Sequence, residues 1–277
     1  MIKMSKEIFF FCVITLFSEF TVYTRSACII IHGTWAKNES WYQPEGDFFY
    51  EIEIANQYLG LVDEVVSFSW SGKLGDLAQR EAGQQLAEKI LGYDFVILIG
   101  HSHGVTVGIQ ASLFLGKINT VGKNFSKIKK FYALGVPVDK VIQMYPDMSV
   151  VDNFYNLFSF GDLIQCVHGL YDRCFKASDN ITNIAVRIDD LHPSHSQLHH
   201  PVIAKHLLAI PDFYQRKKIG NFENFINNHP AEIFFFSKKN LYYQFQNDQS
   251  QRLETDKLAF ELMQYAFFRS KKNLFKD

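Results

Sequence analysis

Three residues of the types that carry out nucleophilic catalysis each follow an apolar segment of strand length. They are Ser102, Asp162 and His195, and the segments before them are residues 95–99, 153–160 and 181–188. A serine hydroxyl becomes a strong nucleophile when an imidazole takes its proton and a carboxylate orients that imidazole. The sequence therefore predicts Ser102 as nucleophile, Asp162 as orienting acid and His195 as base. Asp189 and Asp190 follow the last segment and are the alternative acids.

Ser102 is the central residue of Gly100-His101-Ser102-His103-Gly104, a G-x-S-x-G pattern. A strand enters this pattern, and residues 105–115 leave it with helical spacing. A sharp turn from strand to helix leaves no room for side chains two residues before and after the serine, where the glycines stand. The turn would hold the hydroxyl above the sheet at the positive end of the helix, as in a nucleophile elbow.

A second loop is expected to supply the groups that stabilise an oxyanion. Residues 26–31 form an apolar strand that runs into His32-Gly33-Thr34-Trp35. Gly33 lets the backbone bend, so that the N–H of Thr34 or Trp35 can point at the reacting carbonyl. The other predicted donor is the N–H of His103, the residue after the nucleophile. For His32 we expect a structural role in bracing the loop.

The spacing of the strands and helices predicts an α/β fold. Further strands are expected at residues 62–70 and 128–134, and helices at residues 76–91, with Asp76 as N-cap, and 201–209. Continuous apolar strands that alternate with helices indicate a mostly parallel central sheet flanked by helices. The carboxyl ends of parallel strands meet at one edge, which would bring the three candidate residues together.

Composition fits one enzyme-sized domain. The chain has 277 residues, is 47% hydrophobic and carries a formal net charge of −1. It can bury a large core without metals or disulfides, and the near-neutral charge gives no reason to expect a nucleic-acid partner. We expect the core at residues 27–210, followed by an aromatic extension at residues 211–277 that packs on the core or acts as a cap.

The N-terminus has features of an export signal. Lys3 and Lys6 precede ten residues without a charge, so residues 1–26 are predicted to be a signal peptide of a secreted or periplasmic protein. A cytoplasmic protein is the alternative. Cys166 and Cys174 flank a short loop after Asp162 and could form a disulfide in an exported protein.

Several of these segments resemble the motifs of α/β-hydrolases, in particular bacterial lipases and esterases. The resemblance covers about residues 27–209 and is carried by Ile31-His32-Gly33-Thr34-Trp35, by residues 68–72 with Arg80, by the G-x-S-x-G pattern and by His195-Ser196-x-Leu198. It implies the α/β-hydrolase fold and hydrolysis of a small-molecule or lipid ester by Ser102, Asp162 and His195, without cofactor or metal. Residues 211–277 match no such motif, and peripheral contact with a membrane or lipid is an open expectation for them.

Two other functional classes are open from the sequence. His192, His195, His199 and His200, together with Asp189 and Asp190, could form a metal site. That cluster lacks the H-E-x-x-H pattern and would leave the serine motif unexplained. The chain could also use a hydrolase fold as a binding scaffold without catalysis.

Overall fold

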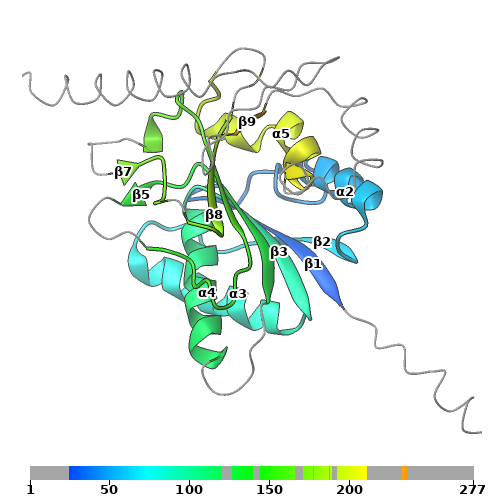
Figure 1. Ribbon diagram of the computed structural model, residues 1–277, viewed down its shortest axis with the longest axis vertical. Coiled ribbons are helices and arrows are strands. Elements are labelled where there is room, and N and C mark those ends of the chain that lie inside the picture. The colour runs from blue at the N-terminus through cyan, green and yellow to red at the C-terminus, as the bar shows by residue number, and fades with distance from the viewer. Residues whose placement is uncertain are drawn as a thin grey trace, which may run out of the picture.

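Six parallel strands make up most of the central sheet (Figure 1). The computed structural model describes residues 25–119, 127–139, 144–165, 171–176, 178–186, 188, 192–210 and 233–235. The sheet has the order β2-β1-β3-β4-β6-β8-β9, in which only β9 is antiparallel to its neighbour. Its strands are β1 (Ser26–Ile31), β2 (Glu64–Phe68), β3 (Phe95–His101), β4 (Ile128–Leu134), β6 (Phe154–Phe158), β8 (Ile181–Val186) and β9 (Ile233–Phe235).

The central strands are apolar throughout because both faces of the sheet are covered. In β1, Ala27, Ile29 and Ile31 pack into the core on one face, whereas Cys28 and Ile30 pack into the core on the other. Every residue of this strand is buried. Alternation along a strand sends successive side chains to opposite faces, so a strand between two helical layers needs apolar residues at every position.

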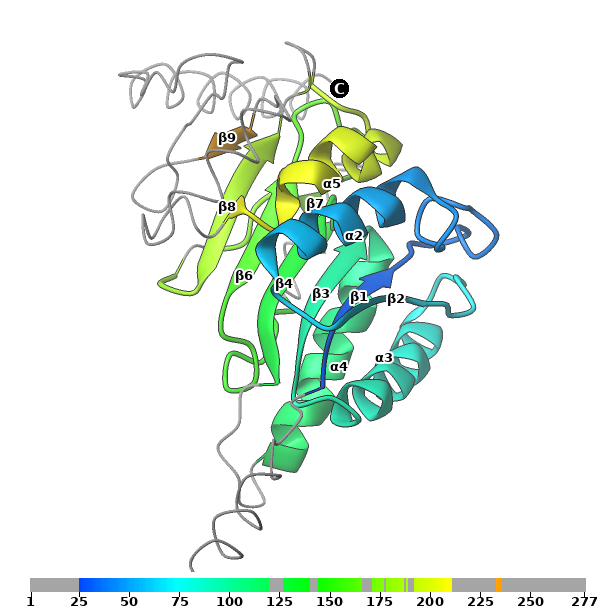
Figure 2. The same cartoon turned by 90° about the vertical axis from the view of Figure 1, so that its right-hand side faces the viewer.

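Two helices cover each face (Figure 2). α3 (Asp76–Leu91) and α4 (His103–Asn119) pack on one face, and α2 (Asp47–Leu59) and α5 (Pro201–Leu207) pack on the other. An ion pair of 3.3 Å between Lys205 and Glu51 joins α5 to α2. The predicted α/β architecture, a mostly parallel central sheet flanked by helices, is confirmed.

Some local details differ from the sequence-based expectations. Gly75, not Asp76, occupies the N-cap of α3, and Asp76 is the first residue of the helix. Trp41, Tyr42, Phe48 and Phe49 are buried, and residues 47–59 form α2, a helix that the sequence did not predict. A two-stranded antiparallel pair, β5 (Val138–Asp139) with β7 (Tyr171–Asp172), was also not expected.

The strand order fixes where a site can form. The chain runs outward from β1 to β2 and then crosses back to β3 on the other side of β1. In such sheets the crevice lies at the carboxyl ends of the strands where this reversal occurs. β1 and β3 are paired in parallel with Ile31 beside Gly100, so the loop after β1 meets the G-x-S-x-G turn directly.

Several predictions fall on residues outside the described ones. These include residues 1–24 of the predicted signal peptide, Cys166 of the predicted disulfide, and Asp189 and Asp190. Of the predicted C-terminal extension, only β9 is described after residue 210. Within the described ranges, the helices are all too short or too polar to cross a bilayer.

Candidate active site

Ser102 occupies a tight turn between β3 and α4. Its backbone has φ of 53°, a left-handed conformation that residues other than glycine rarely adopt. The Ser102 N–H donates to the carbonyl of Leu134 at the end of β4, over 2.8 Å. A Cβ on Gly100 would lie 2.8 Å from the backbone N of Val105, and a Cβ on Gly104 would lie 2.5 Å from the carbonyl oxygen of His32. The glycines are therefore required sterically, as the sequence predicted.

Asp162 and His195 form a hydrogen-bonded pair close to this turn. The Oδ2 atom of Asp162 lies 2.8 Å from Nδ1 of His195, and the Asp162 carboxylate is fully buried. The other oxygen, Oδ1, accepts hydrogen bonds from the backbone N–H groups of Ile164 and Gln165. An Nδ1–H that donates to a carboxylate leaves Nε2 of His195 available for proton transfer.

The His195 ring lies beside the residue that precedes Ser102. The ring centroids of His195 and His101 are 4.7 Å apart. The Asp162–His195 pair thus lies next to the turn that carries Ser102, at the carboxyl edge of the sheet. Among the described residues the Ser102 hydroxyl has no hydrogen-bond partner, and bonds of this kind often tighten only when a substrate is bound.

Two residues that sequence reasoning missed support the Asp162–His195 pair. Gly135, with φ of 64°, follows β4, and a Cβ there would lie 3.1 Å from Oδ2 of Asp162 and 3.3 Å from Nδ1 of His195. The Arg173 guanidinium donates to the carbonyl oxygens of Ser159, Phe160 and Asp162 at 3.0, 3.4 and 3.1 Å. Gly135 leaves space for the pair, and Arg173 fixes the backbone that carries the acid.

His32 braces the loop after β1. Its Nε2 accepts from the backbone N–H of Trp70, so its Nδ1 must be the donor to the carbonyl of Gly33. The indole N–H of Trp70 in turn donates to the His32 carbonyl. Burial, the largest effect, lowers the pKa of His32 and favours the neutral ring that this arrangement needs. The structural role predicted for His32 is confirmed.

The three backbone N–H groups predicted to bind the oxyanion differ in whether they already have a hydrogen-bond acceptor. The Trp35 N–H already donates to the carbonyl of Gly72 over 2.9 Å, which argues against Trp35 as a donor to substrate. Among the described residues, the backbone N–H of Thr34 has no backbone acceptor. The buried Thr34 hydroxyl has no hydrogen-bond partner among these residues either. The N–H of His103 stands at the first position of α4, where a helix offers no internal acceptor.

Two further imidazole rings, those of His103 and His199, lie near His195, and burial favours their neutral form by lowering their pKa. Burial, followed by the charge on His195, lowers the pKa of His103 to about 4. Burial is also the main cause that lowers the pKa of His199 to about 4. The His199 ring stacks on Trp41, with centroids 4.3 Å apart and an interplanar angle of 13°.

The four histidines of the hypothetical metal site have separate partners. His195 pairs with Asp162, His199 stacks on Trp41, and Nδ1 of His200 accepts from the N–H of Val202. His192 packs edge-on against Phe160. Across the described ranges, no three side chains of His, Cys, Asp or Glu are grouped as metal ligands would be. These positions do not support the proposed histidine cluster.

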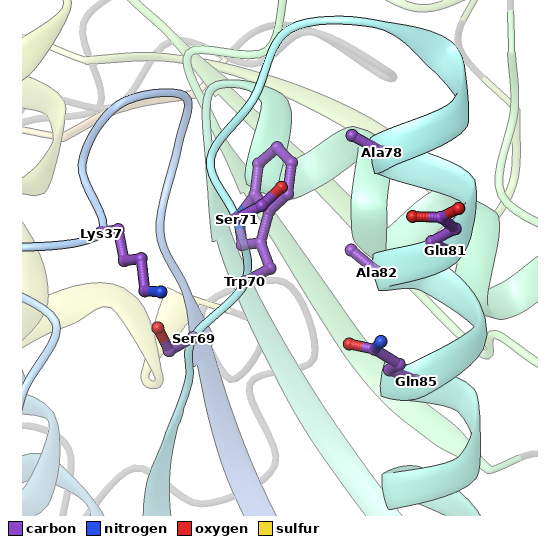
Figure 3. A pocket seen from close by; sticks show the side chains of 8 residues that line it. All are labelled: Lys37, Ser69, Trp70, Ser71, Ala78, Glu81, Ala82 and Gln85. Carbon is purple, nitrogen blue, oxygen red and sulfur yellow. The ribbon is translucent and has the colours of Figure 1, made fainter.

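The lining of a pocket of about 310 Å³ does not include Ser102, Asp162 or His195. Figure 3 shows the side chains that line it. It is lined by Lys37 from the loop after β1, by residues 69–71, and by Ala78, Glu81, Ala82 and Gln85 of α3. Its wall includes Trp70, which binds His32. The pocket therefore adjoins the loop after β1, which is expected to supply donors to the oxyanion.

Comparisons with known proteins gave distant structural likenesses only. No family model matches the chain, and no curated protein matches it. One solved structure, a protein from Xanthomonas campestris pv. campestris assigned to the alpha/beta hydrolase superfamily, has 16% identity and a TM-score of 0.42 over 69% of this chain and 99% of its own. Another, a cutinase-like protein from Cryptococcus sp., has 13% identity and a TM-score of 0.38 over 73% of this chain and 94% of its own. Likenesses at this level decide nothing about chemistry.

Proposed function

We propose that this protein is a serine hydrolase that cleaves carboxylic esters through an acyl-enzyme intermediate. The observation that carries the proposal is the hydrogen-bonded Asp162–His195 pair, which lies next to the turn that carries Ser102. The backbone of Ser102 has the left-handed conformation of a nucleophile elbow. A serine held in a strained turn, next to an imidazole already oriented by a carboxylate, matches what acyl transfer requires.

In the proposed mechanism, Oγ of Ser102 attacks the ester carbonyl carbon while Nε2 of His195 takes the hydroxyl proton. Asp162 holds the ring with Nδ1–H toward itself and stabilises the imidazolium. The tetrahedral intermediate collapses, and the imidazolium returns the proton to the leaving alcohol. Water then attacks the acyl-enzyme with His195 again as base, which releases the acid and regenerates the Ser102 hydroxyl.

The negatively charged oxygen of the tetrahedral intermediate needs hydrogen-bond donors to stabilise it. Two candidates are backbone N–H groups, those of Thr34 and His103, and a third is the buried Thr34 hydroxyl. The positive end of α4 favours negative charge at the same place. Trp35 is omitted from this set because its N–H is bonded to Gly72.

We further propose that the substrate has an apolar portion and that the protein touches a lipid surface at this edge. Large apolar side chains are exposed in the segments that follow β1, β2 and β6, which all end at the carboxyl edge. They are Trp35 at 79%, Leu77 at 71%, Leu163 at 75%, and also Leu74 and Ile164. Contiguous exposed apolar groups are typical of surfaces that contact apolar ligands, and we infer that these side chains form such a surface.

A fluorophosphonate probe and a series of p-nitrophenyl esters test the proposal. The probe should modify Ser102, as located by peptide mass spectrometry, and Ser102→Ala should abolish both labelling and turnover while it stays folded. Activity should persist with a chelator and should rise with acyl chain length. Turnover by folded Ser102→Ala, or loss of turnover with chelator, would overturn the serine mechanism. Absence of both labelling and turnover in the native protein would instead favour a binding scaffold.

A further inference from the structure

We propose that His101 is a positioning residue, which holds the base His195 in place by donating a hydrogen bond from Nε2–H to the His195 backbone carbonyl. The inference rests on the proposed function, in which His195 is the base. His101 is the residue directly before the nucleophile, so this bond would tie the elbow to the loop that carries the base.

The geometry fixes the direction of this bond. Nε2 of His101 lies 3.0 Å from the carbonyl oxygen of His195. A carbonyl oxygen can only accept, so Nε2 must carry the proton and a neutral His101 has no proton on Nδ1. Nδ1 is buried and has no hydrogen-bond partner among the described residues. The contact with His195 is therefore the interaction that selects the tautomer of His101.

The surroundings of His101 keep its ring neutral and immobile. The ring is buried and lies beside the rings of His195, His199 and Trp41, with centroids 4.7, 4.8 and 5.6 Å away. Burial is the main cause that holds the pKa of His101 well below its usual value, and the neighbouring imidazoles, His103 included, add to it. When His195 takes a proton during the reaction, the repulsion between imidazolium groups keeps His101 neutral, so the bond persists.

The loop that carries His195 packs against the rest of the protein through Leu198, which is fully buried, and through the stacking of His199 on Trp41. Its hydrogen bonds between Ser194 and Gln197, and from the N–H of Leu198 to the His195 carbonyl, are internal to the loop. Asp162 fixes the ring of His195, whereas His101 fixes its backbone. Both constraints are needed to aim Nε2, because rotation of the backbone would move the ring even with Nδ1 still near Asp162.

Two substitutions separate this bond from simple packing. His101→Leu removes the donor and keeps an apolar side chain, whereas the amide N–H of His101→Gln reaches about as far as imidazole Nε2. Because misplacement of a catalytic group by about 1 Å can cost roughly 10²-fold, we expect His101→Leu to lower kcat about 10- to 100-fold and to change KM by less than about threefold. His101→Gln should recover kcat to within about fivefold of the unmodified protein.

Ser112→Ala is the matched control. Ser112 is buried in α4, the helix that follows the Ser102 turn. Its hydroxyl donates to the carbonyl of Ile109 and accepts from the N–H of Asp147. This substitution removes buried hydrogen bonds without touching the site. Its kcat should equal that of the unmodified protein even if its thermal stability falls.

Nitrogen-15 NMR of the histidine rings provides a readout that does not depend on activity. In the unmodified protein His101 should be the Nε2–H tautomer, and the Nδ1–H of His195 should exchange slowly with water. In His101→Leu that exchange should be faster, and in His101→Gln it should be slow again. An Nδ1–H tautomer for His101, or equal exchange and kcat in all variants, would overturn the proposal.

The NMR readout also separates this proposal from the proposed function. If the native protein neither hydrolyses esters nor reacts with a fluorophosphonate, the proposed function fails, and the exchange of the His195 Nδ1–H still decides whether His101 positions it. If His101→Leu does not fold, two other measurements test the proposal. They are the tautomer of His101 in the native protein and the kcat of His101→Gln. If folded His101→Gln shows the same loss of kcat as is expected for His101→Leu, the proposed role of the hydrogen bond to the His195 carbonyl is contradicted.

Discussion

The carboxylate of Asp162 is held from three directions, and the 2.8 Å contact between its Oδ2 and Nδ1 of His195 is one of them. The other two are the backbone N–H groups of Ile164 and Gln165, which bind Oδ1. The carboxylate is fully buried, so water cannot replace any of these partners. This arrangement leaves one orientation for the acid and one tautomer for His195.

Asp162→Asn should leave the protein folded and lower kcat by about 10⁴-fold, because an amide in this position favours the wrong tautomer of the histidine. KM should change little. Steady-state kinetics with a p-nitrophenyl ester measures both quantities. Asp189→Asn and Asp190→Asn are the matched controls and should keep nearly full activity. A larger loss of kcat in either control would transfer the role of the acid.

Thr34→Val should lower kcat without a comparable change in KM. The variant keeps the shape and the backbone N–H of Thr34 but loses the buried hydroxyl, and removal of one oxyanion donor typically costs about 10²–10³-fold in rate. Thr34→Ser retains a hydroxyl and should stay within about tenfold of the unmodified protein. Similar rates for the Val and Ser variants would show that the hydroxyl takes no part.

Ser102→Gly and Ser102→Ala should both be inactive but should differ in stability. The left-handed backbone at Ser102 costs an alanine about 1–2 kcal/mol and costs a glycine almost nothing. The greater freedom of glycine in the unfolded chain offsets part of this, so the Gly variant should be more stable than the Ala variant by about 1 kcal/mol. Urea denaturation measures the difference. An Ala variant at least as stable as the Gly variant would contradict strain at this residue.

Arg173→Lys should lower both stability and kcat. A lysine keeps the charge, but its ammonium cannot bind three carbonyl oxygens with the planar geometry of a guanidinium. We expect a loss of about 2 kcal/mol in unfolding free energy and about tenfold in kcat, because the loop that carries Asp162 loosens. Lys176→Met removes an exposed cation from the same segment and serves as the control. Equal kcat in the two variants would contradict the role of Arg173 in fixing the backbone that carries Asp162.

Acidification should destabilise the protein through its buried histidines. The pKa of His103 and that of His199 fall to about 4 in the folded state, mainly through burial, from an ordinary value of 6.5. Between these values the unfolded chain binds protons that the folded chain does not, so unfolding free energy falls as pH falls. Each histidine contributes at most about 1.4 kcal/mol per pH unit in this window and nothing above it.

His199→Phe tests this dependence because a phenyl ring can still stack on Trp41 but cannot bind a proton. Urea denaturation at pH 7 and at pH 4.5 should show a smaller loss of stability for the variant than for the unmodified protein. Parallel losses in the two proteins would show that His199 does not contribute.

The sheet was predictable from the sequence because its strands are continuous apolar runs. β1 and β4 have the predicted limits, and α3 begins and ends at the expected residues. The motif residues could be placed because the carboxyl ends of parallel strands converge. By contrast, α2 is rich in aromatic and β-branched residues, such as Phe48, Phe49 and Ile52, whose preference for helix is weak, and tertiary packing decides its structure.

Contacts between loops could not be predicted. That Arg173 binds the backbone around Asp162 depends on the path of the chain through β7, a strand of only two residues. The hydrogen bond from Trp35 to Gly72 likewise joins two loops whose approach follows from the pairing of β1 with β2. Such contacts have no periodic pattern, because each depends on where two distant segments happen to meet.

The pairing of β9 with β8 has a consequence for how the protein can be shortened. β9 covers residues Ile184 to Val186 of β8 with antiparallel hydrogen bonds, so this part of β8 is not an open edge. A chain that stops at Ile210 would keep every residue of the proposed site but would present an unpaired apolar strand to other molecules. Exposed strands of this kind recruit further strands. Truncation would therefore be expected to cause self-association and loss of soluble protein before it caused any loss of intrinsic activity.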